Sequence, residues 1–155
     1  MERVTRPLVP EDVEAVAALE CLVFPQEAWS PALLLEELGS PWSHYLGVFE
    51  GSALIAYGGI KGEQEGDLMT LAVAPSYRRQ GIGEKLTKDL IASARAAGIK
   101  QLFLEVRRSN TVAQRLYAGL GFRTIHIIPD YYPSPTEDAL LMFCDLSGFP
   151  KPDVA

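Results

Sequence analysis

The chain has 155 residues, with 14 lysines and arginines against 20 aspartates and glutamates, which gives a formal net charge of −6. The length fits a single domain, and 48% hydrophobic and 22% charged residues are typical of a soluble globular protein. No apolar run approaches the roughly 20 residues of a membrane-spanning helix, no apolar leader follows Met1, and the acidic balance argues against broad nucleic-acid binding. We expect a cytoplasmic domain over residues 1–146 and a flexible tail over residues 147–155.

Composition also argues against disulfide and metal chemistry. The two cysteines, Cys21 and Cys144, cannot form a disulfide framework or a four-ligand zinc site. Both lie in mostly apolar segments, so we expect reduced cysteines in the core. The only histidines, His44 and His126, are far apart in the sequence. We therefore predict no metal site.

Hydrophobic patterning and turn residues predict alternating strands and helices along the chain. Pro10 opens a helix with Glu11 and Asp12 in its first turn, where acidic side chains suit the positive helix end. Ser30 and Pro31 begin a second helix as N-cap and first-turn residues. The predicted elements, in chain order, are a strand over 4–9, helices from 10 and over 30–39, strands over 45–50, 54–61 and 68–73, a helix over 81–97, a strand over 101–107, a helix over 110–118, and strands over 122–128 and 139–146.

The order β-α-α-β-β-β-α-β-α-β-β predicts an α/β fold with a mixed, mostly antiparallel sheet of six or seven strands. The strand–helix–strand unit over residues 68–107 is expected to form a right-handed parallel crossover, flanked by antiparallel hairpins. Each helix must bury an apolar stripe, so helices are expected on both faces of the sheet.

The most informative segment is residues 71–83, with the sequence Leu-Ala-Val-Ala-Pro-Ser-Tyr-Arg-Arg-Gln-Gly-Ile-Gly. A buried strand leads through a proline break and two arginines to Gly81 and Gly83, at the start of an amphipathic helix. Glycine lets the backbone approach a ligand closely, and the unpaired N–H groups of a helix N-terminus bind anions. The nucleotide-triphosphate signature is absent, and a dinucleotide fingerprint would need glycine in place of Leu86. The remaining interpretations are another anion cradle and a pair of glycines that only shape a tight loop.

The spacing Arg78-x-x-Gly81-x-Gly83 resembles the pyrophosphate-binding motif of the GCN5-related N-acetyltransferases, the GNAT superfamily. The predicted element order is similar to the fold of that superfamily. Further segments resemble the bacterial ribosomal-protein-alanine N-acetyltransferases of the RimI type, and the resemblance extends over about residues 4–146. These segments are residues 28–30 (Ala-Trp-Ser), 104–110 (Leu-Glu-Val-Arg-Arg-Ser-Asn), 131–133 (Tyr-Tyr-Pro) and 137–139 (Glu-Asp-Ala).

The resemblance implies acetyl-coenzyme A (acetyl-CoA) as the acetyl donor. The backbone of Leu71, Ala72 and Val73 would hold the pantetheine arm and polarise the thioester carbonyl, and Asn110 would make a polar contact to the same arm. The pyrophosphate would lie in the motif that Arg78 opens. Its ligands would be the backbone amides of Arg79, Gln80, Gly81, Ile82, Gly83 and Glu84.

Glu105 is the candidate base, because an amine acceptor is an ammonium at neutral pH and must lose a proton before it attacks. Alternation along the strand over 101–107 places Phe103, Glu105 and Arg107 on one side. A carboxylate in such an apolar strand is expected to be desolvated, which suits a base working near neutral pH. The residues alone leave open a structural ion pair with Arg107. The resemblance implies the catalytic role, directly or through a water.

Tyr117 is the candidate acid that protonates the leaving thiolate. It shares a helical stripe with Ala113, Leu116 and Leu120, so the pattern alone indicates a tyrosine of the core. Residues 113–122 match the family pattern A-x-x-L-Y-x-x-x-G-F, whose tyrosine is the proton donor. The resemblance therefore implies a catalytic role.

For the acceptor, the resemblance implies that the loop with Tyr131 and Tyr132 and the region of Trp29 flank a peptide N-terminus. Ordinary aromatic packing is the alternative for these side chains. In the family, the acceptor is the N-terminal alanine of a small-subunit ribosomal protein, which is a basic partner. Nearby acidic residues would either attract a basic peptide or form a solvated rim; they are Glu27, Asp130, Glu137 and Asp138.

We therefore expect an enzyme that acetylates a peptide or protein α-amine by direct transfer in a ternary complex, since neither cysteine lies in the motif region. Two alternatives use the same cofactor machinery: an acetyltransferase of lysine side chains or small amines, and a non-catalytic acetyl-CoA-binding module. Glu105 and Tyr117 argue against the second, because a binding module needs neither. No nucleic-acid or membrane partner is expected, and the sequence is compatible with a monomer and with a dimer.

Overall fold

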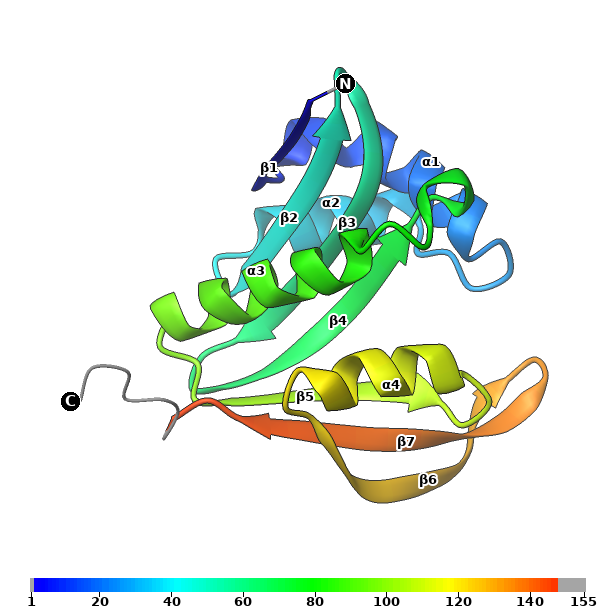
Figure 1. The fold of residues 1–155 in the computed structure, drawn as a ribbon. Helices are drawn as coiled ribbons and strands as arrows, with labels where there is room; N and C mark the ends of the chain where they lie inside the picture. Colours follow the sequence, from blue (N-terminus) through cyan, green and yellow to red (C-terminus); the bar gives the residue numbers. More distant parts are fainter. Residues whose placement is uncertain (1, 148–155) are drawn as a thin grey trace.

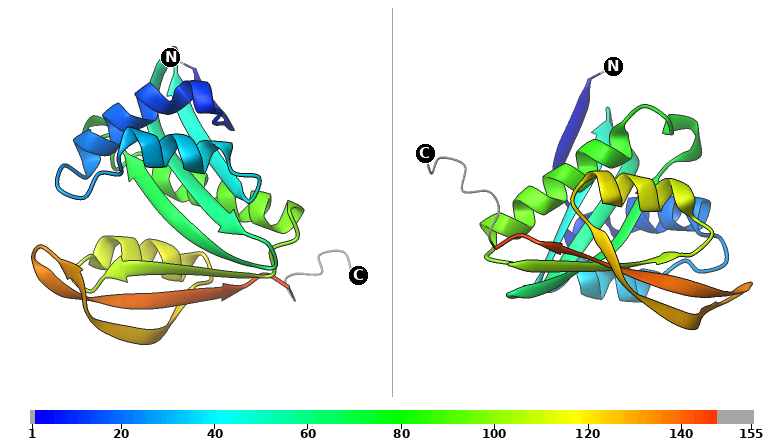
Figure 2. Two further views of the ribbon diagram at one scale, coloured as in Figure 1. Left: turned by 180° about the vertical axis from the view of Figure 1, so that it is seen from behind. Right: turned by 60° about the horizontal axis from the view of Figure 1, so that its bottom comes forward.

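The computed structural model describes residues 2–147, so residues 148–155 of the predicted tail lie outside the described part. Seven strands form one sheet in the order β1-β2-β3-β4-β5-β7-β6, and helices cover both of its faces (Figure 1 and Figure 2). Neighbouring strands are antiparallel except β4 and β5, which are parallel. The predicted mixed, mostly antiparallel sheet is confirmed.

The structure contains every helix and strand that the sequence predicts, and two short 3-10 helices besides. The elements before the motif segment are β1 (Arg3–Pro7), η1 (Pro10–Asp12), α1 (Val13–Val23), α2 (Pro31–Gly39), β2 (Ser43–Glu50), β3 (Ala53–Gly62) and β4 (Glu65–Val73). Those that follow are η2 (Pro75–Tyr77), α3 (Ile82–Ala96), β5 (Gln101–Arg107), α4 (Thr111–Gly119), β6 (Arg123–Pro133) and β7 (Thr136–Asp145).

The largest difference from the prediction is the length of β6. The strand predicted over residues 122–128 continues to Pro133, so Tyr131 and Tyr132 lie in a strand and not in a loop. Pro129 is tolerated because β6 is an edge strand, where a missing N–H need not cost a ladder hydrogen bond. The register with β7 is irregular around Asp130, which has a φ of 51°, and the pairing then resumes. The two tyrosines are therefore held by strand pairing.

Two hydrophobic clusters, one on each face, hold the sheet between its helices. On one face α3 buries Leu86 and Leu90, at the spacing that predicts a helix, and α4 adds Tyr117 to the same cluster. On the other face α1 and α2 bury Val16 and Leu34 against the sheet. Figure 2 shows this second pair of helices from behind the view of Figure 1. The two hydrophobic clusters thus lie on separate faces of the sheet, and each site residue can be assigned to one face or the other.

Strands β4 and β5 pair only at their beginnings and then diverge (Figure 1). Their register joins residues 65–67 to residues 101–103 and stops there. Beyond that point β4 stays paired with β3 on its other side, and β5 stays paired with β7. Each strand therefore has one edge with no strand neighbour, and both of these edges face the widening gap. The segment after Leu68 and the segment around Glu105 form these two edges.

The two cysteines differ in their burial. Cys144 is buried, but Cys21 is exposed on α1, so the prediction of two core cysteines is wrong for Cys21, which lies off the buried stripe of its helix. Within residues 2–147, no helix has the length and hydropathy to cross a bilayer. The same residues include no group of three or more histidine, cysteine or acidic side chains placed to hold a metal ion.

Candidate active site

The basic loop between β4 and α3 has a backbone suited to an anion. Arg79 and Gly81 both have a positive φ, 66° and 77°, and Gly81 is the N-cap of α3. The first N–H groups of a helix have no intrahelical acceptor, and here they belong to Ile82, Gly83 and Glu84. The positive end of the helix dipole lies at the same place. Backbone donors and dipole therefore both favour negative charge here.

Gly81 and Gly83 are glycines for different reasons. Gly81 has a left-handed φ that side chains rarely adopt, although a Cβ there would meet no atom within 4 Å. Gly83 has ordinary helical geometry, and its Cβ would lie 3.7 Å from Val73 Cγ2 and 4.0 Å from Leu71 Cδ2, which are normal contacts. Packing within the chain therefore does not require glycine at position 83. A tight loop explains Gly81, whereas Gly83 leaves room for about one methyl group between the start of α3 and the Val73 and Leu71 side chains of β4.

The open edge of β4 presents the backbone groups of only some of its residues. The Ala74 N–H donates to the Ile55 carbonyl of β3 at 2.9 Å. Backbone groups alternate sides along a strand, so Ala72 also directs its N–H and carbonyl toward β3, whereas Leu71 and Val73 direct theirs to the gap. Arg78 Nε donates to the Val73 carbonyl at 3.1 Å, in agreement with this alternation. The Leu71 and Val73 N–H groups therefore face the gap, and Ala72 does not contribute one.

Side chains of β1 and β2 form hydrogen bonds with the loop before α3. Tyr77 donates its hydroxyl to Glu50 at 2.9 Å, and Arg3 donates to the same carboxylate at 3.2 Å and to Gln80. A cavity of about 370 Å³ adjoins this contact, and its lining includes Gln80, Gly81 and Ile82. Three of the predicted cofactor residues thus line one cavity.

Asn110 occupies the N-cap of α4. Its side-chain oxygen accepts a hydrogen bond from the Ala113 N–H at 3.1 Å. The oxygen is therefore already used for capping, and the side-chain nitrogen is the group left to contact a cofactor arm.

Glu105 lies on the face of β5 that is opposite α3 and α4. Leu102, Leu104 and Val106 are buried in the cluster beneath α3, so alternation sends Glu105 to the other face. The side chain is exposed, so the predicted desolvation is not found. The reason is the divergence of β4, which leaves this part of β5 paired with β7 on one side and without a strand neighbour on the other. Tyr131 donates its hydroxyl to Glu105 Oε1 at 3.3 Å.

The structure does not show the predicted alternative for Glu105, an ion pair with Arg107. Arg107 instead pairs with Glu27 and with Glu137. Glu105 is consequently a carboxylate on an open strand edge, and its one hydrogen bond among the described residues comes from a tyrosine hydroxyl. Such a group can accept a proton without first breaking a salt bridge.

Tyr117 is buried on the face opposite Glu105. Its ring lies edge-to-face with Phe122, with centroids 5.8 Å apart, and it belongs to the same cluster as Leu104 and Val106. Burial raises the pKa of Tyr117 to about 12, and Tyr132 adds to the shift. The phenol is therefore protonated at neutral pH. Glu105 and Tyr117 flank β5 from opposite faces, where β4 has turned away.

The three aromatic residues predicted to contact the acceptor have different surroundings. Trp29 is half-buried and packs against the core beneath α1 and α2, so packing accounts for its ring. Tyr131 is 47% exposed, and its ring lies edge-to-face with Tyr132 at 5.0 Å between centroids. Burial, with a contribution from Tyr131, raises the pKa of Tyr132 to about 12. The two tyrosines therefore form a protonated pair beside Glu105.

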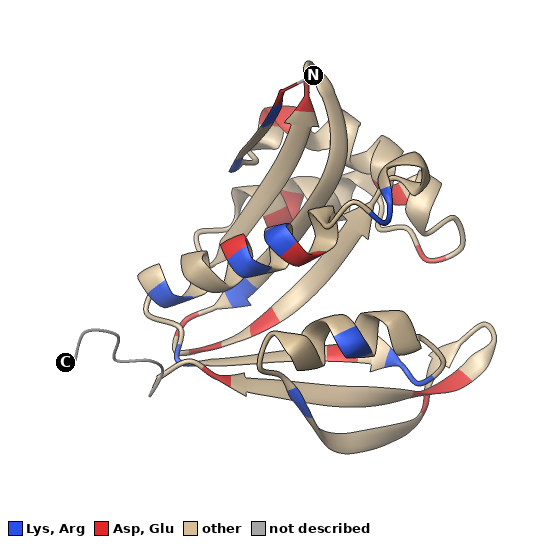
Figure 3. Ribbon diagram, viewed as in Figure 1, with Lys and Arg blue, Asp and Glu red and all other residues tan. Residues whose placement is uncertain are grey.

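The acidic residues near these tyrosines are largely paired within the chain. Glu27 and Glu137 both contact Arg107, and Asp138 pairs with Arg108 at 3.1 Å. In Figure 3 the basic segment after β5 lies beside the acidic end of the β6–β7 hairpin. Three of the four carboxylates considered from the sequence therefore form ion pairs within the chain, and the fourth, Asp130, is exposed.

Glu20, a carboxylate on α1 that is only 2% exposed, is not among the candidate residues that the motifs indicate. It accepts hydrogen bonds from the Tyr57 hydroxyl and, at 3.1 Å, from the Trp29 N–H. Glu20 thereby holds the backbone at Trp29, just before the start of α2. The available signal is its spacing, since a charged residue four positions after the buried Val16 falls on the apolar stripe of the helix.

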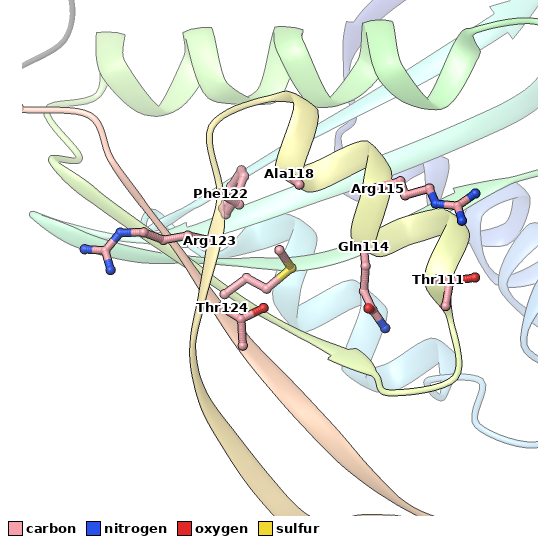
Figure 4. A pocket seen from close by; sticks show the side chains of 8 residues that line it. Thr111, Gln114, Arg115, Ala118, Phe122, Arg123 and Thr124 are labelled. Carbon is pink, nitrogen blue, oxygen red and sulfur yellow. The ribbon is translucent and has the colours of Figure 1, made fainter.

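A further cavity of about 490 Å³ lies between α4 and the strands β6 and β7 (Figure 4). None of the predicted site residues lines it. Its lining residues are Thr111, Gln114, Arg115, Ala118, Phe122, Arg123, Thr124 and Met142.

Comparison with known proteins identifies the family of the chain. Residues 13–122 match the profile of the acetyltransferase (GNAT) family. The chain is 36% identical over 150 residues to the N-alpha-acetyltransferase RimI of Mycobacterium tuberculosis, covering 93% of this chain and 92% of the relative. It is 40% identical over 118 residues to a ribosomal protein bS18-alanine N-acetyltransferase of Haemophilus ducreyi, covering 74% and 81%.

A solved structure agrees with these relatives. The ribosomal-protein-S18-alanine N-acetyltransferase of Escherichia coli superimposes with a TM-score of 0.88 and 28% identity, over 97% of each chain. The diverging strands and the motif before α3 thus occur in a fold of known chemistry. The chain belongs to the acetyltransferase (GNAT) family and is an acetyl-CoA-dependent N-acetyltransferase.

Proposed function

We propose that this enzyme acetylates the α-amino group of a peptide, and that its acceptor is the N-terminal alanine of a small-subunit ribosomal protein. Relatives that share most of the chain are named for alanine acetylation of ribosomal protein bS18. The observation that carries the proposal is the pairing of Glu105 with Tyr131 on an open strand edge, opposite the buried Tyr117. A ribosomal substrate also places the enzyme in the cytoplasm.

The donor side is assigned to the gap edge of β4 and to the start of α3. Acetyl-CoA, when bound, supplies an acetyl group activated as a thioester. The N–H groups of Leu71 and Val73 would hold its pantetheine arm, because they face the gap. The amides of residues 79–84 would hold the pyrophosphate, and Gly83 would let the backbone approach it. The nitrogen of the Asn110 side chain would contact the arm.

Glu105 is assigned as the base on the acceptor side. It would take a proton from the incoming ammonium and pass it to water, which its exposure permits. Tyr131 donates its hydroxyl to Oε1 of this carboxylate and would orient it toward the acceptor. The neutral amine then attacks the acetyl carbonyl carbon, so that a C–N bond forms and the C–S bond breaks.

Tyr117 is assigned as the acid that protonates the departing sulfur. Its pKa of about 12 lies above the value of about 8.5 for a free thiol. Donation is therefore uphill unless the phenol regains a proton in the same step. The nitrogen loses its second proton as the amide forms, and that proton replaces the one that Tyr117 gives up. Charge and protons then balance without a covalent acyl-enzyme.

The acceptor would enter on the face that carries Glu105. Tyr131 and Tyr132 would flank the peptide N-terminus from β6, and the α1–α2 segment (residues 24–30), which contains Trp29, would flank it from the other side. Both tyrosines are protonated, and because the Tyr131 hydroxyl donates to Glu105, the Tyr132 hydroxyl is the one left to donate to a peptide carbonyl. The pairing of nearby carboxylates with arginines leaves Glu105 as an unpaired charge for the ammonium.

A thiol-release assay with acetyl-CoA tests the proposal. The acceptor is a basic peptide that begins Ala-Arg, compared with the same peptide blocked at its N-terminus. Release that requires the free N-terminus supports α-amine acetylation. Equal release from both peptides, when each contains lysine, overturns it in favour of lysine acetylation. Release with neither peptide, with acetyl-CoA still bound in calorimetry, favours a small-amine enzyme or a binding module.

A further inference from the structure

Arg107 joins three separate segments on the acceptor face, and the proposed transfer does not use it. Its Nη2 contacts Glu27 of the α1–α2 segment. Its Nη1 donates to Glu137 at 3.1 Å and to the Pro135 carbonyl at 3.3 Å, both in the β6–β7 hairpin. These partners lie 80, 30 and 28 residues away in the sequence. One side chain at the end of β5 thus connects both sides of the acceptor face.

The same guanidinium also lies over an aromatic ring of the predicted acceptor site. Its central carbon is 4.2 Å from the centroid of the Tyr132 ring, which is within the range of a cation–π contact. Arginine is suited to this position, because its planar group can donate to two carboxylates and stack on a ring at once. Lysine can supply the charge but not this combination of contacts.

The contacts of Arg107 form one network that is partly sheltered from solvent. The side chains of Arg107 and Glu137 are 21% and 18% exposed, whereas that of Glu27 is 42% exposed. Glu137 also accepts a hydrogen bond from the Ser109 N–H at 2.6 Å, which ties the network to the start of α4. Without the guanidinium, the carboxylates of Glu27 and Glu137 would face each other with no cation between them. They would then repel, and the segments that carry them would separate.

We propose that Arg107 is a positioning residue that sets the spacing between the α1–α2 segment and the β6–β7 hairpin and fixes Tyr132 toward the acceptor. The inference rests on the proposed function, since it concerns the peptide that enters between these segments. Arg107 governs affinity for the acceptor, because its own side-chain contacts lie on the acceptor face. It approaches the predicted cofactor ligand Asn110 only indirectly, through Glu137 and the Ser109 N–H. The motif before α3 shares none of the Arg107 contacts.

The neighbouring Arg108 provides a matched control. It has the same chemistry at the next position, its side chain is 59% exposed, and it pairs with Asp138 at 3.1 Å. The substitution Arg108→Met removes a charge and an ion pair from the same short segment. It leaves the contacts of Arg107 in place.

The experiment compares Arg107→Met, Arg107→Lys, Glu27→Gln and Arg108→Met with the wild type in steady-state kinetics on the Ala-Arg peptide. Calorimetry measures peptide binding to the full-length enzyme saturated with CoA. We expect Arg107→Met to raise the peptide KM and dissociation constant at least about tenfold, which corresponds to about 1.4 kcal/mol of binding free energy. The KM for acetyl-CoA should be unchanged. Arg107→Lys should be intermediate, and Arg108→Met should resemble the wild type.

The double variant Glu27→Gln with Arg107→Met tests whether the two residues act together. It should be no worse than Arg107→Met alone, because residues of one network do not act additively. An unchanged peptide KM in Arg107→Met overturns the inference, as do equal losses for peptide and acetyl-CoA. If Arg107→Met fails to fold, Glu27→Gln decides alone: a raised peptide KM supports the inference, and an unchanged one overturns it.

The wild-type measurement separates this inference from the proposed function. Absence of α-acetylated product with the wild type overturns the proposed function by itself. The same variants are then compared on a lysine-containing peptide with a blocked N-terminus. A selective rise in its KM for Arg107→Met still supports the positioning role, and no such rise overturns it.

Discussion

Gly83→Ala should stabilise the fold and weaken cofactor binding at the same time. The new Cβ would lie 3.7 Å from Val73 Cγ2 and 4.0 Å from Leu71 Cδ2, so it meets no steric conflict within the chain. Alanine is favoured over glycine in helices by about 1 kcal/mol, and somewhat less near an end. We expect the free energy of unfolding to rise by about 0.5–1 kcal/mol. That corresponds to a Tm higher by about 1–4 °C for a chain of this size.

The effect on acetyl-CoA has the opposite sign. The Cβ would project between the start of α3 and the open edge of β4, where the proposal places the pyrophosphate and the pantetheine arm. A methyl group there holds the ligand away from the amides of the helix N-terminus. We expect the dissociation constant to rise at least about tenfold, which corresponds to about 1.4 kcal/mol of binding free energy.

Thermal unfolding without ligand and calorimetric titration with acetyl-CoA measure the two effects. Gly39→Ala is the matched control, because Gly39 ends α2 and its Cβ would meet nothing within 4 Å. The control should keep the affinity of the wild type. If Gly83→Ala binds acetyl-CoA as tightly as the wild type, the reasoning that assigns this backbone to the cofactor is refuted.

The remaining predictions concern the proton transfers and the response to pH. Glu105→Gln should lower kcat by about 10²–10⁴-fold with acetyl-CoA affinity preserved, and near-normal turnover would remove Glu105 as the base. Tyr117→Phe should lower kcat by a similar factor in the same kinetic assay, and full activity would assign the proton donor elsewhere. The free energy of unfolding should fall as pH rises from about 10 toward 12, because unfolded tyrosine ionises while Tyr117, with a pKa of about 12, stays neutral in the fold. Urea unfolding of Tyr117→Phe should show a shallower fall, and an unchanged slope would contradict this reasoning.

Local patterns predict the parts of the site that depend on short spacing. The glycines of the motif lie at the start of α3, where their spacing from Arg78 predicts them. Alternation on β5 correctly separates Glu105 and Arg107 from the buried aliphatic residues. The helical stripe correctly predicts that Tyr117 is buried. Each of these features is set by the period of one element.

Features that depend on which strands pair with one another cannot be predicted from local patterns. Glu105 is exposed because β4 turns away after pairing with the start of β5, and no local pattern specifies where two strands part. The length of β6 follows from its edge position beside β7, which makes Pro129 tolerable. The contacts of Arg107 join segments distant in sequence, so spacing within residues 104–110 predicts only its face and not its partners.

The position of the acetyl group on a product peptide tests the central claim most directly. The enzyme is incubated with acetyl-CoA and a peptide that begins Ala-Arg and contains a single internal lysine, and tandem mass spectrometry locates the added acetyl group. We predict acetylation of the N-terminal nitrogen, with the lysine unmodified. Acetylation of the lysine side chain with a free N-terminus would contradict it.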